Sequence, residues 1–169
     1  IIEMESSWAA GIDEYIEKGL ALRERWREHA LVSFALAPHS PYTVSDDGLA
    51  RIAELSDRQA LRVHMHVLET EWELKQSYQQ HDCHPLARLE RNGLLNERLL
   101  AVHMTQLSAP DIDRVARSQA SVVHCPQSNL KLASGFCPVA GLLEAGVNVA
   151  LGTDGAAANN DLDMLAEAQ

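Results

Sequence analysis

The chain has 169 residues, of which 46% are hydrophobic and 22% are charged. That balance suits a single globular unit and argues against a disordered chain. Lys and Arg number 14 against 24 Asp and Glu, and the formal net charge of −10 disfavours nucleic acid and anionic membrane surfaces as partners.

Neither a membrane anchor nor a disulfide framework is indicated. No apolar run approaches the roughly 20 residues of a transmembrane helix, and the opening Ile-Ile-Glu-Met does not resemble a signal peptide. The three cysteines, Cys83, Cys125 and Cys137, are an odd number without a CxxC pair. We therefore expect a reducing, cytoplasmic environment.

Short apolar runs alternate with helical patterns along the chain. The runs are rich in Val, Leu and Ala and mostly continuous, which is typical of strands buried on both faces. Ser45 is well placed as a helix N-cap, and Gly93 and Gly146 stand where helix C-caps belong. In chain order we predict a helix at 7–28, a strand at 31–37, a helix at 46–59, a strand at 61–68, helices at 71–80 and 85–92, a strand at 99–104, a helix at 109–118, a strand at 121–124, a helix at 138–145 and a strand at 147–151.

Strands that alternate with helices form βαβ units and hence a parallel sheet. An open doubly wound sheet and a (β/α)8 barrel both fit. A doubly wound sheet would favour a glycine-rich phosphate-binding motif after a strand, and the sequence has none. A barrel places its chemistry at the carboxyl ends of several strands. We therefore predict an α/β fold, a partial (β/α)8 TIM barrel. The polar residues at the five strand ends are His39, His66 with Glu69, His103, His124 and Asp154.

The second predicted strand carries the pair His64 and His66, whose imidazoles point to the same side. Such a pair can chelate a metal or can simply be buried and hydrogen-bonded. His66 lies nearer the carboxyl end and is the predicted ligand, whereas His64 is expected one layer deeper. Glu69, just past the strand, can reach a metal-bound water or a substrate nitrogen, although in isolation it would be interpreted as a helix-start acid.

Later strands add His103 and Asp154. A lone histidine such as His103 is as often a core residue as a functional one. Asp154 stands between Thr and Gly, where a carboxylate has no packing role and needs a cation or hydrogen-bond donors. The stretch 124–131 has the composition of a turn. Three further histidines, His29, His81 and His84, are expected at the surface.

Together these side chains predict metal-assisted hydrolysis. Two imidazoles and a carboxylate make a zinc- or iron-like site, harder than one that includes Cys125. A divalent metal lowers the pKa of its bound water to about 7. Asp154 would then take the proton of that water, Glu69 would protonate a ring nitrogen of the substrate, and His103 would orient the water.

The sequence resembles the deaminase and chlorohydrolase branch of the amidohydrolase superfamily, and within it the 5-methylthioadenosine/S-adenosylhomocysteine deaminases. The resemblance implies a (β/α)8 barrel with one divalent metal, usually zinc. It implies His66 and Asp154 as ligands, His39, Glu69 and Asp154 as substrate contacts, and His103 as a partner of the water. The motifs that carry it are residues 37–42, 66–71, 101–103, 128–135 and 151–160.

Two features of such proteins have no counterpart in the sequence. Neither the HxH of the first barrel strand nor the small N-terminal β-sandwich is found, so residues 1–169 are expected to be an excerpt of one catalytic barrel, comprising strands four to eight. Some relatives place an arginine for the substrate's tail before the fourth strand. Residues 11–17 offer acids there, which leaves the group on the ribose 5′ carbon open.

The resemblance therefore implies hydrolytic deamination of the adenine of a nucleoside, with release of ammonia. Its expected partner is a small purine nucleoside, and relatives commonly form homo-oligomers. Deamination of a free purine or pterin base, and hydrolysis of a triazine, are alternatives within the superfamily. A metal-free relative that only binds is an alternative of another class, and metal content would distinguish it.

Overall fold

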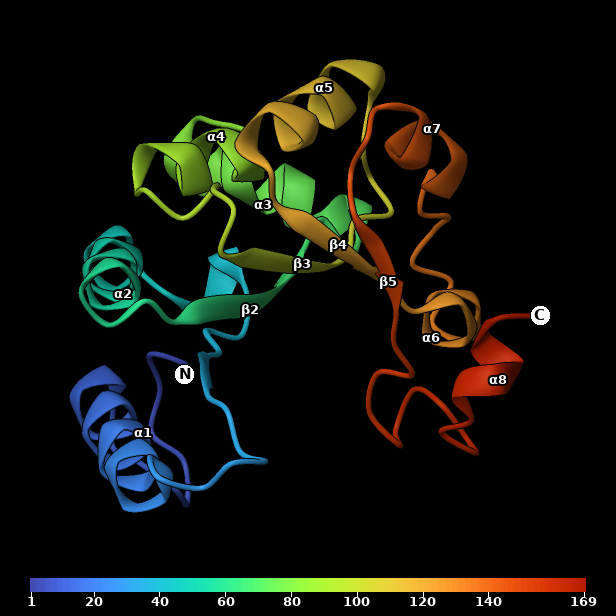
Figure 1. Cartoon of the computed structure of the whole chain (residues 1–169). Helices are drawn as coiled ribbons and strands as arrows, with labels where there is room; N and C mark the ends of the chain where they lie inside the picture. The colour runs from blue at the N-terminus through green and yellow to red at the C-terminus, as the bar shows by residue number, and fades with distance from the viewer.

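The computed structural model describes residues 1–169 and contains one sheet of five parallel strands in the order β1-β2-β3-β4-β5 (Figure 1). Strand order equals chain order, so every crossover moves one place in the same direction. A doubly wound sheet would reverse direction at a switch point. The fold is therefore the predicted partial barrel. The strands are β1 (Ala35–Leu36), β2 (Arg62–Val67), β3 (Leu99–His103), β4 (Ser121–His124) and β5 (Val149–Leu151).

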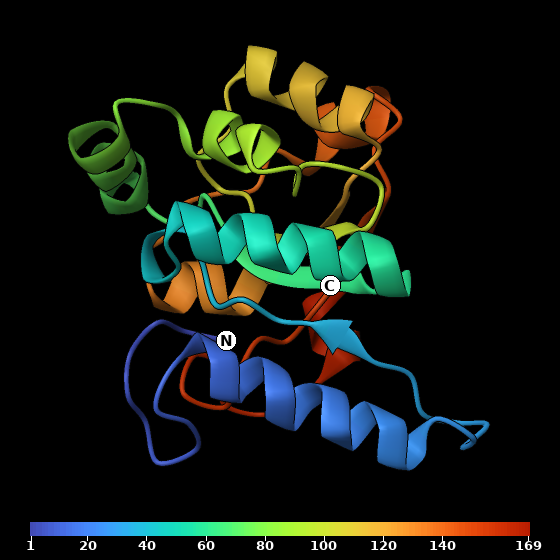
Figure 2. The ribbon, with the colours of Figure 1, turned by 90° about the vertical axis from the view of Figure 1, so that its left-hand side faces the viewer.

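Helices connect the strands and pack against one face of the curved sheet, with α2, α4, α5 and α7 forming an arc outside it (Figure 1). Figure 2 shows α1 and α2 side by side, with β1 and the N-terminal segment between them. No helix is long and apolar enough to cross a membrane. The helices are α1 (Ile12–Trp26), the 3-10 helix η1 (Pro41–Thr43), α2 (Asp46–Gln59), α3 (Glu71–His81), α4 (Pro85–Arg91), α5 (Ala109–Ser118), α6 (Pro126–Lys131), α7 (Val139–Glu144) and α8 (Met164–Glu167).

Several predicted helix ends are confirmed by their caps. The Ser45 hydroxyl accepts a hydrogen bond from the Gly48 amide at the start of α2 (3.1 Å). Gly93 and Gly146 follow α4 and α7 with φ of +75° and +77°, a conformation that glycine adopts without a side-chain clash. These two glycines end their helices and let the chain turn back towards the sheet.

Burial on both faces of the strands was predicted, and it is wrong for β2 and β5. Val63, Met65 and Val67 of β2 are buried against the helices, whereas Arg62 and His64 on the opposite face are exposed. The helices cover the buried face of β2, whereas β5 lies at the edge of the sheet and both Ala150 and Leu151 are exposed.

Several predicted segments differ in their secondary structure, and the helix expected from residue 7 begins only at Ile12. Residues 126–131 form the short helix α6 rather than a turn, because Pro126 at its first position fixes a helical φ and its missing N–H would have had no partner there. The first strand is only two residues long, and Leu31, in the predicted part of that strand, is 91% exposed. Leu31 lies outside the hydrogen-bonded pairing of β1 with β2, so composition alone predicted a β1 that is too long.

Candidate metal and catalytic site

Three of the predicted site residues meet at the carboxyl ends of β2, β3 and β5. The potential ligand atoms of His66, His103 and Asp154 all lie within 4.8 Å of one another. The imidazole rings of His66 and His103 stack, with centroids 5.3 Å apart and an interplanar angle of 29°. The predicted convergence of these three residues is confirmed, and it follows from the parallel register that brings the strand ends to one rim.

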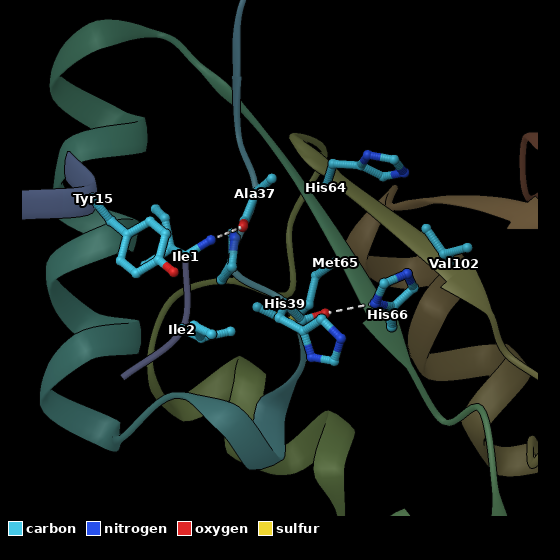
Figure 3. A pocket seen from close by; sticks show the side chains of 10 residues that line it. Ile1, Ile2, Tyr15, Ala37, His39, His64, Met65, His66 and Val102 are labelled. Atoms are coloured by element: carbon cyan, nitrogen blue, oxygen red, sulfur yellow. Dashed lines mark hydrogen bonds between the residues drawn. The ribbon is translucent and has the colours of Figure 1, made fainter. Parts of the chain in front are cut away.

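The orientation of the His66 ring is fixed by the backbone of the preceding strand end. Its Nδ1 lies 2.9 Å from the carbonyl oxygen of His39 (Figure 3). A carbonyl can only accept, so Nδ1 carries the proton and Nε2 keeps its lone pair. Burial, together with the neighbouring His103 and His39, lowers the pKa of His66. The ring is therefore held in the neutral form that binds metals.

His103 is fixed in the same way by a side chain. Its Nδ1 lies 2.8 Å from the Oδ1 of Asn129 in α6, and both residues are almost fully buried. In the neutral imidazole, Nδ1–H donates to the amide oxygen, so Nε2 is the nitrogen with the free lone pair, and it is directed into the site. That Nε2 lies 3.9 Å from the Oε2 of Glu69.

Asp154 follows β5 in a left-handed conformation, with φ of +58°. Its Oδ2 accepts a hydrogen bond from the Ser128 hydroxyl at 2.6 Å. Burial acts to raise the pKa of Asp154, but the bonds from Ser128 and Gly155 and the nearby His103 and His66 hold it below its ordinary value. The carboxylate is thus ionised at neutral pH and available to a cation.

Glu69 lies just beyond β2 with its carboxylate turned to the same place. The Ser134 hydroxyl is 3.5 Å from its Oε1, and His103 is on the side of Oε2. The side chain is 21% exposed, so it is accessible to a small molecule from the rim. This position suits a group that transfers protons better than one that binds the metal ion.

His39 lies at the end of the β1 segment, with its ring 5.0 Å from that of His66 in an edge-on arrangement. Its Nδ1 is 3.1 Å from the Ser40 hydroxyl. Partial burial lowers its pKa. A cavity of about 270 Å³ opens between this strand end and the first residues of the chain (Figure 3).

The remaining candidates stay outside the cluster. His64 lines the same cavity, is exposed, and is not part of the ligand group. Cys125 is buried, and burial raises the pKa of its thiol to about 12, so it carries a proton at neutral pH. His29 is exposed, but the expected surface positions of His81 and His84 are wrong in part, because both are partly buried. His84 is half-buried, because its Nδ1 accepts from the Leu86 amide and caps α4.

The donor set fits a divalent metal ion. His66 and His103 both have an Nδ1 that donates to a fixed acceptor and an Nε2 that is unprotonated, an arrangement typical of metal-binding imidazoles. The Asp154 carboxylate adds a hard, charged oxygen. Two imidazoles and one carboxylate suit zinc or iron, whereas the protonated Cys125 thiol adds nothing to the set.

Sequence reasoning missed four side chains that hold this site together. Ser128 and Asn129 lie in the 128–135 motif, which was noted, but the contacts they make were not predictable without the fold. Thr105 and Glu73 bind the backbone at Glu69. For Glu73 a signal was present, because Thr70 and Glu73 have the spacing of a helix capping box.

A model of the amidohydrolase family matches residues 9–169. The 5-methylthioadenosine/S-adenosylhomocysteine deaminase of Teredinibacter turnerae is 53% identical over 169 residues, which is 100% of this chain and 38% of that protein. The 5′-deoxyadenosine deaminase of Methanothrix thermoacetophila is 40% identical over 167 residues, covering 99% of this chain and 39% of that protein.

Solved structures show the same similarity. An adenosine deaminase from Xanthomonas campestris with bound zinc superposes with a TM-score of 0.96 at 51% identity, covering 99% of this chain and 38% of that one. The zinc complex of an atrazine chlorohydrolase from Arthrobacter aurescens superposes with a TM-score of 0.89 at 22% identity, covering 96% and 36%, a likeness of fold alone. The chain spans well under half the length of each of these relatives.

Proposed function

The chain belongs to the amidohydrolase family, and on that premise we propose that the full-length protein hydrolytically deaminates the adenine ring of a nucleoside such as 5-methylthioadenosine or S-adenosylhomocysteine. Water replaces the exocyclic amino group, so an adenosyl compound gives an inosyl compound and ammonia. The observation that carries the proposal is the convergence of His66, His103 and Asp154 beside the carboxylate of Glu69.

Within that protein, residues 1–169 form part of one catalytic (β/α)8 barrel and supply its strands four to eight. The first strands, with their HxH pair, and the small β-sandwich lie outside these residues. Two lines of support are the sequential parallel strand order and the coverage of 38% of a 53% identical deaminase. The cytoplasmic location and the homo-oligomeric state stay predictions of the sequence.

His66 and Asp154 are the proposed ligands of one divalent metal ion. Zinc is the preferred metal, and Fe²⁺ is the alternative. Zinc is present in the Xanthomonas campestris relative at 51% identity. When bound, such an ion makes water a strong nucleophile at neutral pH. The tautomer of His66 is already set for this role by its bond to the His39 carbonyl.

The other side chains move protons and orient the reactants. His103 accepts a hydrogen bond from the attacking water at Nε2, because its Nδ1 proton is committed to Asn129. Asp154 takes the proton of that water, and the Ser128 hydroxyl steadies the receiving carboxylate. Glu69 relays the second proton of the water to a ring nitrogen of the substrate, which makes the attacked carbon more electrophilic. The proton held by Asp154 then goes to the amino group, which leaves as ammonia.

Substrate contacts come from His39, Glu69 and Asp154, which approach the mouth from three different strand ends. His39 is exposed at the rim, and its Nδ1 is engaged with the Ser40 hydroxyl, so its Nε2 remains for the substrate. The three groups together can hydrogen-bond donors and acceptors along the edge of a purine. A planar heterocycle with donors and acceptors on its edge is the substrate class that this arrangement favours.

A panel of substrates tests the proposal. Zinc-loaded full-length protein is assayed for ammonia release from 5-methylthioadenosine, S-adenosylhomocysteine, adenosine, guanine, 8-oxoguanine and a chlorotriazine. We expect turnover of at least one adenine nucleoside and little with the bases and the triazine. Turnover of only a free base or only the triazine would support an alternative within the family. A protein that holds no metal and releases no ammonia would support the binding-only alternative.

A further inference from the structure

We propose that Glu73, a buried residue of α3 outside the ligand cluster, is a positioning residue for Glu69. Its carboxylate fixes the backbone from which the Glu69 side chain projects, and so aims that side chain at the reacting atoms. The proposal rests on the proposed function, because it assigns Glu69 its part in proton transfer.

The carboxylate of Glu73 binds two consecutive amides. Its Oε1 accepts from the Leu68 N–H at 2.9 Å, and its Oε2 accepts from the Glu69 N–H at 3.0 Å. Glu73 is only 2% exposed, so water does not compete for either bond. Both carboxylate oxygens of Glu73 thus hold the backbone N–H groups of the turn that carries Glu69.

The opposite side of the same turn is held by Thr105, two residues past the end of β3. The Thr105 hydroxyl lies 2.7 Å from the Glu69 carbonyl oxygen and 3.3 Å from that of Leu68, and the Thr105 amide donates to the Leu68 carbonyl at 3.0 Å. With N–H groups bound on one side and carbonyls on the other, the Cα–Cβ direction of Glu69 is set. From that position the side chain extends so that its Oε2 lies 3.9 Å from the Nε2 of His103.

The turn needs such support because Leu68 has a φ of +51°. Leucine has a Cβ, and the left-handed conformation brings that atom close to its own carbonyl oxygen. An unsupported turn would therefore relax towards the ordinary regions of backbone conformation. The two bonds from Glu73 oppose that relaxation and would be lost with it.

Helix capping alone does not account for Glu73. In a capping box the N3 side chain binds the amide of the N-cap residue, which here is Thr70. The Thr70 hydroxyl does accept from the Glu73 amide at 3.3 Å. The Glu73 carboxylate, however, reaches past Thr70 to the two preceding amides. Its bonds therefore stabilise the turn that carries Glu69 rather than the end of α3.

The acid also carries an electrostatic cost. Burial raises the pKa of Glu73 to about 7, the two amide bonds act in the opposite direction, and the charge of Glu69 adds to the rise. No ion pair involves Glu73 in the structure. Hydrogen bonding to the two amides is what offsets the burial of this group.

The test is a double-mutant cycle in the zinc-loaded full-length protein. In Glu73→Gln one oxygen still accepts an amide proton, but the new NH2 group faces the second N–H. We expect kcat to fall about 10- to 100-fold, because a displacement near 1 Å costs that much, while KM and zinc content stay within about twofold. In the background of Glu69→Gln the same substitution should have almost no further effect on kcat, because Glu73 acts through Glu69.

Glu71→Gln is the matched control. Glu71 is an exposed acid in the same helix turn, and its ion pair is with Lys75. Its variant should keep kcat within twofold. If Glu73→Gln fails to fold, Glu73→Asp takes its place in the cycle, since it keeps the charge but is one methylene too short for both amides.

Equal effects of the Glu73 substitution with and without Glu69 would overturn the proposal, because a purely structural residue gives additive losses. An unchanged kcat would overturn it as well. If the wild-type protein shows no deaminase activity at all, the proposed function fails separately. Crystal structures of wild type and the Glu73 variant then decide the positioning claim, which requires that the Glu69 side chain leave its place beside His103.

Discussion

The Nδ1 atom of His103 at the end of β3 lies 2.8 Å from the Oδ1 atom of Asn129 in α6. The two residues are 26 positions apart in the sequence, and the bond is buried. It determines which nitrogen of His103 carries the proton and therefore which faces the site unprotonated. The short helix after β4 is thereby connected to the chemistry at the end of its neighbouring strand.

Removal of that amide should impair turnover without unfolding the protein. In Asn129→Ala the imidazole of His103 can take either tautomer and can rotate, so we expect kcat to fall about 10- to 100-fold. The measurement is kcat per bound zinc in the full-length protein. Asn148→Ala is the control, because Asn148 is exposed and its side chain bonds only to Ser121. Equal activity of the two variants would show that the tautomer of His103 does not matter.

Glu69→Gln should leave the metal in place and remove most of the turnover. Gln keeps the size and one acceptor oxygen of Glu69 but cannot exchange a proton. General acid–base groups contribute roughly 10²- to 10⁴-fold, and a loss of kcat in that range is expected. Zinc content and kcat are measured on the same preparation. A variant that loses its zinc would show that Glu69 is a ligand, and our assignment of its role would be wrong.

Ser128→Ala should weaken the metal site. The Ser128 hydroxyl donates to the Asp154 carboxylate, and such bonds orient a ligand for its ion. We expect the zinc affinity to fall about tenfold, measured by competition with a chelator. The neighbouring Ser134→Ala, whose hydroxyl lies 3.5 Å from Glu69, should change the affinity little. The reverse order of the two variants would contradict the assignment of Asp154 as a ligand.

The raised pKa of Glu73 predicts a pH-dependent stability difference. Its pKa is about 7 in the fold against an ordinary 4.5, so the folded protein binds this proton more tightly than the unfolded one. Its contribution to stability is therefore present below about pH 4.5 and is lost as the pH rises to about 7. Glu73→Gln cannot ionise. The free energy of unfolding of wild type minus that of the variant should fall across this window by at most roughly 3 kcal/mol.

Urea unfolding at the two ends of the window measures that difference. The groups around Glu73, namely Glu69, Tyr42, His81 and Arg88, are the same in both proteins, so their own titration largely cancels. If the free energy of unfolding of wild type minus that of Glu73→Gln stays constant or grows between about pH 4.5 and about pH 7, the pKa of Glu73 is not raised in the fold.

Much of the fold was predictable from the sequence because local patterns determine it. Alternating apolar runs and helical periodicity predicted α2, α5 and β4 at their observed bounds. The length of β1 was not predictable, because the ladder depends on a neighbouring strand rather than on composition. The face of each strand that is buried also depends on where the helices pack.

The site was predictable to the extent that barrel topology brings strand ends together. His66, His103 and Asp154 are far apart in the sequence, yet each directly follows or ends a strand, and that position alone implied convergence. The supporting side chains, Asn129 and Glu73, were not predictable. Their roles depend on side-chain direction within a short helix and a helix start, and composition does not report that direction.

Conversion of 5-methylthioadenosine in water enriched in heavy oxygen tests the central claim most directly. The zinc-loaded full-length protein should release one ammonia per product, and the product should carry the heavy oxygen on its purine ring. In Glu69→Gln the rates of both signals should fall about 10²- to 10⁴-fold. Binding of the nucleoside without ammonia release, or a product without the heavy oxygen, would contradict hydrolytic deamination at this site.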